Sequence, residues 1–159
     1  MTAVTTELLD GHMTWAQTFM KETWGGTQQV SRGTLYDVLD YPGFVAVVDG
    51  KPQGVATYRI YGDQCEIMMI HSAIEGVGAG SALMDRVEEA AREVKCTRLW
   101  LITTNDNIPA IRWYQRRGFS LVTVHVQAMK LSRKLKPDIP ATGYDSIPIR
   151  DEIELEKQL

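Results

Sequence analysis

The sequence predicts a single mixed-sheet α/β (α+β) domain, in which an antiparallel strand meander precedes a strand–helix–strand unit. Two observations favour this fold class. Apolar, strand-forming segments separated by tight-turn signals fill residues 44–70. A glycine-rich stretch at residues 75–80, a helical pattern and a buried run at residues 98–103 follow in that order. Because one helical crossover joins the last two strands, we expect them to be parallel with a right-handed connection.

Length and composition indicate an ordinary globular chain. The 159 residues predict one domain spanning residues 1–159. Lysine and arginine number 17 against 20 aspartate and glutamate, a formal charge of -3, so nothing indicates a nucleic-acid or anionic-membrane surface. No apolar run approaches the ~20 residues of a membrane helix, and the N-terminus has no secretory pattern. Cys65 and Cys96 have no metal-binding spacing. We therefore expect a cytoplasmic protein with no metal site and two buried thiols.

The N-terminal third begins with weak signals. The first ten residues form a short strand or a loose end. Apolar residues recur at three- and four-residue steps from His12 to Trp24, which predicts a helix ended by Gly25 and Gly26. A second short helix is expected from Thr34 to Leu39, because the residue before Pro42 disfavours helix.

The meander consists of three strands joined by two tight turns. Phe44 to Val48 is a continuous apolar run, and Asp49-Gly50 after it is a hairpin signal. Gln53 to Tyr61 is rich in strand formers. Gly62-Asp63 is a second turn, and Cys65 to Ile70 is the third strand.

The strand–helix–strand unit follows. Its helix has one apolar stripe, formed by Leu83, Val87, Ala90, Ala91 and Val94. Arg98 to Thr103 reads as a buried strand, and Asn105 to Pro109 as a turn. Pro109 suits the first turn of a further helix, which Gly118 ends.

The C-terminal part has less regular patterns. Phe119 to Met129 is expected to be a strand, and the basic residues between Lys130 and Lys136 a solvated face. Arg150 to Leu159 alternates apolar with acidic residues, which favours a final strand with one wet face.

The segment Glu75-Gly76-Val77-Gly78-Ala79-Gly80-Ser81 lies between a predicted strand and a predicted helix. Glycine lets the backbone approach a ligand closely, and the first turn of a helix presents unpaired N–H groups. Together these features favour a phosphate site, although a tight turn without ligand is an equal alternative from this loop alone. The spacing fits neither a dinucleotide-binding fingerprint nor a Walker loop.

A second motif makes the interpretation specific. Residues 107–119 read Asn-x-x-Ala-x-x-x-Tyr-x-x-x-Gly-Phe, which resembles the second signature of the GNAT superfamily of N-acetyltransferases. Glu75-x-x-Gly78-x-Gly80 occupies the place of their first signature, Arg/Gln-x-x-Gly-x-Gly/Ala. The resemblance covers about residues 44 to 129. It implies a GNAT-like fold with splayed parallel strands and acetyl-CoA as the acetyl donor.

The resemblance also implies the cofactor contacts. The loop amides would hold the pyrophosphate of CoA, and the pantetheine arm would lie between the strands that end near His71 and Thr103. The implied cofactor-binding residues are Ile70, His71, Ser72, Glu75, Gly76, Val77, Gly78, Ala79, Gly80, Ser81, Asn105, Asn107, Ala110 and Tyr114. Glu75 departs from the usual arginine or glutamine, and its charge is unfavourable near a pyrophosphate. This departure leaves open a non-catalytic acyl-CoA sensor.

Candidate catalytic residues follow from the chemistry of amine acetylation. The attacking amine must lose a proton to a base, and the departing thiolate gains from an acid. Tyr114 matches the family tyrosine near the cofactor sulfur, which implies the role of acid. Glu66, in Cys65-Glu66-Ile67, resembles the glutamate base of histone-type members. His71 is the alternative base, because imidazole titrates near neutrality, and solvent is a third.

The acceptor has no motif of its own. The leading hypothesis is an acetyl-CoA-dependent N-acetyltransferase acting on a small-molecule or peptide amine. A bare interaction protein, whose final acidic strand pairs with a partner's sheet edge, is a further alternative. By analogy with the family, a homodimer would form through the last strands.

Overall fold

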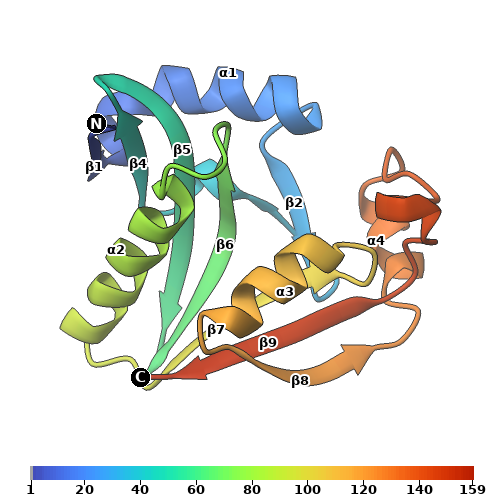
Figure 1. Cartoon of the computed structure of the whole chain (residues 1–159). Helices are drawn as coiled ribbons and strands as arrows, with labels where there is room; N and C mark the ends of the chain where they lie inside the picture. Colours follow the sequence, from blue (N-terminus) through green and yellow to red (C-terminus); the bar gives the residue numbers. More distant parts are fainter. Residues whose placement is uncertain (1) are drawn as a thin grey trace. The chain divides into compact units, whose positions relative to one another are not determined.

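The computed structural model describes residues 2–159 and divides the chain into two compact units. Residues 2–28 and 37–97 form the first unit, and residues 29–36 and 98–159 form the second. Figure 1 labels the elements of both.

The first unit is an antiparallel sheet with a helix on each face. Its strands are β1 (Val4–Leu8), β4 (Gly43–Val48), β5 (Lys51–Tyr61) and β6 (Gln64–Ser72), paired in that order. The two helices are α1 (Met13–Trp24) and α2 (Ala79–Glu93). The predicted meander and its first turn are confirmed, since Asp49 and Gly50 have φ of 49° and 82°.

The two faces of this sheet are distinguished by their contacts. Ala16 and Met20 of α1 belong to one buried cluster with Val45, Val55 and Met69 of the strands. These strand residues therefore face α1. Phe44 precedes Val45 and points the other way, where the Arg86 guanidinium of α2 lies 4.5 Å from the centre of its ring. The two helices thus cover opposite faces.

The second unit is a three-stranded antiparallel sheet with β9 (Glu152–Gln158) in the middle. It is flanked by β7 (Arg98–Thr104) and β8 (Ser120–His125). The helices are α3 (Ile108–Arg116) and α4 (Met129–Leu135), and a short 3-10 helix (η3) spans Tyr144–Ser146. Because β9 has a partner on both sides, the hypothesis that it offers a free edge to another protein is wrong.

The hairpin of β2 (Gln28–Ser31) and β3 (Thr34–Asp37) corrects the prediction of a helix from Thr34 to Leu39. Only Val38–Asp40 is helical, as a single 3-10 turn (η2). Arg32 and Gly33, with φ of 48° and 79°, form the two-residue turn that joins the strands. Most of the hairpin lies in the second unit.

Two further expectations for the C-terminal part are wrong. The strand expected to reach Met129 ends at His125, because Gln127 has a positive φ of 59° and α4 begins two residues later. The acidic side of β9 is not wet: Glu152 and Glu154 are 2% and 6% exposed. The parallel pairing expected for the strands on either side of α2 stays a prediction.

Candidate active site

The glycine loop in the first unit joins the end of β6 to the start of α2 (Figure 1). Gly76 and Gly78 have φ of 79° and 86°, a conformation that side chains rarely adopt. A Cβ at either position would meet nothing within 4 Å, so conformation and not crowding requires glycine here. Gly78 is the residue that caps α2, and the first helical bond runs from Ala82 N to Gly78 O, 3.0 Å.

The charge expected at this loop is positive. The N–H groups in the first turn of a helix have no hydrogen-bond partner within the helix. The dipole of the fifteen-residue α2 adds partial positive charge at the same end. Ser72 fixes the backbone between β6 and the glycine loop, because its hydroxyl donates to Ile74 O (2.7 Å) and accepts from Ile74 N (3.3 Å). The Glu75 side chain is exposed, so water screens its charge. The loop therefore has the geometry of an anion site.

A β-bulge in β6 places the two candidate bases on one face of the sheet. Residues five apart on a regular strand point to opposite faces. In β6, however, Ile67 and Met69 pair with neighbouring residues of β5, and Met68 is the extra residue between them. Glu66 and His71 consequently both lie on the α1 face. Sequence patterns alone gave no sign of this bulge.

Glu66 is buried and ion-paired. Its carboxylate is 2% exposed and accepts from Arg59 Nη2 at 2.9 Å. The same guanidinium lies 4.6 Å from the centre of the Tyr61 ring. A buried charge needs such a partner, so the ion pair accounts for Glu66 without any role as a base.

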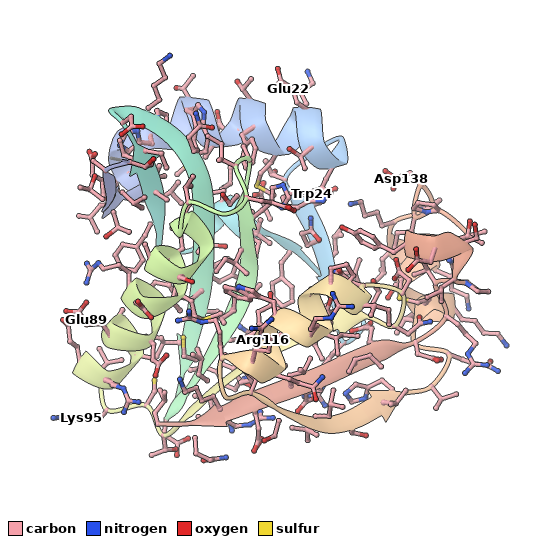
Figure 2. The ribbon with its side chains drawn as sticks, in the orientation of Figure 1. Glu22, Trp24, Glu89, Lys95, Arg116 and Asp138 are labelled. Carbon is pink, nitrogen blue, oxygen red and sulfur yellow. The ribbon has the colours of Figure 1, made fainter. Side chains whose placement is uncertain are left out.

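His71 has a different environment, formed by aromatic rings of α1. The imidazole stacks on Phe19 with ring centroids 5.5 Å apart, and its edge meets Trp24 at 4.7 Å. The side chain of Trp24 extends from the C-terminal end of α1 (Figure 2). Burial lowers the pKa of His71, while the nearby Glu75 carboxylate opposes this shift. The imidazole is therefore neutral at pH 7 and able to accept a proton.

Trp15, Phe19 and Trp24 serve two purposes. Trp15 stacks on Phe19 at 4.9 Å, and all three pack on the buried cluster beneath α1. The three side chains therefore contribute to the core, and Phe19 and Trp24 also enclose the candidate base. The helical spacing of aromatic residues could not indicate that a histidine lies between them.

Tyr114 lies on α3 in the second unit. Its side chain is buried, with edge-on contacts to Trp113 (5.3 Å) and Phe119 (5.6 Å). Burial raises the pKa of the Tyr114 phenol well above its ordinary value of 10.0. The hydroxyl therefore keeps its proton across the neutral range, as a general acid requires.

Asn107 and Asn105 have structural partners inside the second unit. Asn107 caps α3: its side chain accepts from Ala110 N at 3.4 Å. The Asn105 amide oxygen accepts from Arg150 N (3.0 Å) and Asp151 N (2.9 Å), and its NH₂ group donates to Pro148 O (2.9 Å). These bonds fix residues 148–151 to the end of β7. Contacts of either asparagine with pantetheine stay predictions.

A charged network on β9 was not predicted. Arg98 donates to Glu154 (2.5 Å) and Glu156 (2.7 Å), and His125 contacts Glu154 at 3.0 Å. Burial opposes ionisation of Glu154, but hydrogen bonds from His125 and Arg98 hold the pKa of its carboxyl below 4.5. Glu152 accepts instead from Ser132 and from the Arg32 backbone. In the sequence, the one sign of this network is Arg98, a charged residue at the start of a predicted buried strand.

Residues 2–159 contain neither a metal-binding cluster nor a membrane-spanning helix. No group of three or more His, Cys, Asp or Glu side chains in this range is arranged to hold a metal ion. No helix within the same residues is long and apolar enough to cross a membrane.

Comparison with known proteins then identifies the family. A profile of the Acetyltransferase (GNAT) family matches residues 10–119. The chain belongs to this family. It is therefore an acetyltransferase, as the two sequence signatures predicted.

Relatives similar in sequence include two that match most of the chain. The chain is 41% identical to the uncharacterized protein YxbD of Bacillus subtilis (strain 168) over 142 residues, 89% of each chain. YdhI of the same organism is 41% identical over 140 residues, 87% of this chain and 88% of that one. Streptothricin acetyltransferase of Streptomyces lavendulae is 40% identical over 82 residues, 48% of this chain and 43% of that one.

Solved structures share the fold. The IAA acetyltransferase of Bacillus cereus ATCC 14579 superposes with a TM-score of 0.74 at 19% identity, covering 99% of this chain and 100% of that one. A GNAT family acetyltransferase of Elizabethkingia anophelis, solved with acetyl-CoA bound, gives 0.72 at 17% identity and 98% of both chains. The predicted fold class is thus confirmed.

Proposed function

We propose that this acetyltransferase moves the acetyl group of acetyl-CoA onto a primary amine by direct transfer. One observation carries the proposal: the turn before α2 holds Gly76 and Gly78 at positive φ with nothing within 4 Å of either. Such a turn, opening a fifteen-residue helix, suits the pyrophosphate of CoA. In this proposal the loop from Glu75 to Ser81 binds the pyrophosphate. The residues that contact the pantetheine arm are Ile70, Ser72, Asn105, Asn107 and Ala110.

The protonation states support two catalytic roles. His71, neutral at pH 7, takes a proton from the acceptor's ammonium group. The free amine attacks the thioester carbon, the carbon–sulfur bond breaks, and the Tyr114 phenol protonates the departing thiolate. Glu66 is the weaker candidate for the base, because its buried carboxylate already pairs with Arg59.

The acceptor is a small molecule or a peptide amine. One relative is named streptothricin acetyltransferase, and a structural neighbour is the ribosomal-protein-S18-alanine N-acetyltransferase of Escherichia coli. Both kinds of acceptor therefore belong in the first assays.

Thermal shift and thiol release test the proposal together. Millimolar acetyl-CoA is expected to raise the melting temperature, because a ligand of the native state stabilises it by mass action; sodium acetate is the control. Free CoA should then appear with at least one amine from a panel of polyamines, aminoglycosides and peptide N-termini. Tyr114→Phe should bind acetyl-CoA equally but lower kcat about 10–1000-fold. A melting temperature that acetyl-CoA does not change would contradict the proposal.

Glu75 favours one alternative, a non-catalytic sensor of acyl-CoA. A carboxylate at this position of the loop weakens the field that attracts a pyrophosphate. Binding of acetyl-CoA without CoA release on any amine would favour the sensor over the enzyme.

A further inference from the structure

Three polar side chains form a row on the α1 face of the first unit: His71, Thr57 and Glu66. Alternation along β5 puts Val55, Thr57 and Arg59 on this face. The register with β6 places His71 opposite Val55 and Glu66 opposite Arg59. Thr57 is thus diagonal to both the imidazole and the carboxylate. Diagonal neighbours on paired strands have Cα atoms about 7–8 Å apart, with Met69 directly opposite Thr57. Polar groups too far apart for a direct hydrogen bond can be linked by bridging water.

The hydroxyl of Thr57 is the unexplained member of this polar row. Thr57 is 0% exposed, and within the described residues its Oγ1 has no hydrogen-bond partner. A buried hydroxyl in that state costs stability, and valine, with the same shape, would avoid the cost. The methyl group of Thr57 lies close over Gly43, because a Cβ at that position would be 2.9 Å from Thr57 Cγ2. Packing explains a β-branched side chain here but not its oxygen.

We propose that Thr57 is a proton-relay residue whose hydroxyl, through bridging water, links His71 to Glu66. The inference rests on the proposed function, in which His71 receives the proton of the acceptor amine. The imidazolium N–H passes this proton to a water molecule, which protonates Thr57 Oγ1. The original hydroxyl proton of Thr57 leaves through a second water to the Glu66 carboxylate. Thr57 ends unchanged, and Glu66 becomes a carboxylic acid beside Arg59 until it loses the proton to solvent.

Within the described residues of β5 and β6, the charged side chains on this face are Arg59 and Glu66, and they pair with each other. Glu75, on the loop, is the carboxylate that acts on His71 electrostatically. The surrounding elements α1 and η2 direct their remaining charges elsewhere, to solvent or to a cap: Lys21, Glu22, Asp37 and Asp40. The relay therefore joins the one base to the one carboxylate in the polar row.

A pair of substitutions separates the hydroxyl from the methyl group. Thr57→Val keeps the shape and removes the oxygen, whereas Thr57→Ser keeps the oxygen and removes the methyl. We expect Thr57→Val to lower kcat about 5–50-fold with no change in KM for acetyl-CoA and with an equal or higher melting temperature. Thr57→Ser should keep kcat within about twofold of wild type despite a lower melting temperature. If kcat instead follows the melting temperature, or Thr57→Val is fully active, the relay is refuted.

A second measurement does not depend on turnover. The chain has three histidines, so the ¹⁵N and ¹H signals of His71 can be assigned with the variant His71→Gln and followed by NMR titration. Loss of the hydroxyl link in Thr57→Val should lower the titration midpoint of His71 further, and Thr57→Ser should leave it in place. An identical midpoint in Thr57→Val overturns the link. If no amine is acetylated but the midpoint moves, the proposed function fails while the hydrogen-bonded row stands.

Discussion

At the scale of single residues, burial sets opposite protonation states at two groups that a transfer reaction needs. The Tyr114 phenol is enclosed by aromatic rings, and burial raises its pKa. The His71 imidazole is half-buried between Phe19 and Trp24, and burial lowers its pKa. Desolvation always disfavours the charged form, so it keeps a proton on an acid and off a base. One physical effect thus prepares both candidate catalytic groups.

The pH dependence of activity tests His71. Because burial lowers its pKa from the ordinary 6.5, kcat/KM should fall in acid with a midpoint below pH 6.5, as the imidazole becomes charged. Stability should decline over the same range, since the unfolded chain binds the proton more readily than the native one. His71→Gln should lower kcat about 100–10,000-fold and remove this acid limb.

His12→Gln is the matched control, because His12 pairs with the exposed Glu7 and lies outside the candidate site. It should leave both the rate and the pH profile unchanged. An acid limb that persists in His71→Gln would point to Glu66 or to solvent as the base.

At the scale of elements, two local irregularities position the candidate site. The extra residue Met68 in β6 turns Glu66 to the same face as His71. Left-handed glycines between β6 and α2 open the backbone at the start of the helix. Both lie within a few residues of one strand end. A regular strand followed by an ordinary turn would supply neither feature.

Gly78→Ala tests the loop. Alanine at a φ of 86° costs about 1–2 kcal/mol, and the loop can avoid this cost only by changing its conformation. We expect KM for acetyl-CoA to rise about 5–30-fold with little change in kcat. Gly26→Ala is the control, because Gly26 has no positive φ and its Cβ would meet nothing within 4 Å. Equal KM values for the two variants would exclude a role of the loop conformation in binding.

At the scale of the whole chain, local patterns predicted what local forces decide. The meander, its Asp49-Gly50 turn, the helix after the glycine loop and the helix with Pro109 in its first turn depend on residues close in sequence, and the structure has them. The helix predicted at Thr34–Leu39 is wrong because hairpin pairing with the adjacent β2 prevailed over a weak helical pattern. The wet face expected for β9 is wrong because groups distant in sequence satisfy its carboxylates: Arg98 pairs with Glu154 and Glu156, and Ser132 donates to Glu152.

The candidate site was predictable to the same extent. Two sequence signatures located the loop and Tyr114, because each is a short motif with a fixed spacing. The bulge at Met68, the rings around His71 and the orphan hydroxyl of Thr57 arise from the packing of α1 on the sheet. No single segment contains that information, and the hydrophobic pattern of β6 is the same with or without a bulge.

The buried network of β9 makes the stability of the protein sensitive to acid. Glu154 accepts hydrogen bonds from Arg98 and His125, which hold its pKa below 4.5 against the effect of burial. A carboxyl with a lowered pKa stabilises the native state above its unfolded value of 4.5, and this contribution disappears as pH falls through the folded value. Glu154→Gln should therefore lower the free energy of unfolding at pH 7 by about 1.5–3 kcal/mol, the range for hydrogen bonds to a charged group. Urea unfolding of both proteins at pH 7 and below pH 4 measures the difference, which should shrink in acid because protonated glutamate resembles glutamine.

The exposed ion pair of Glu89 with Arg86 supplies the control, since Glu89→Gln should change stability by less than about 1 kcal/mol at either pH. A difference for Glu154→Gln that is equally large at both pH values would show that packing, and not charge, holds this carboxylate in place.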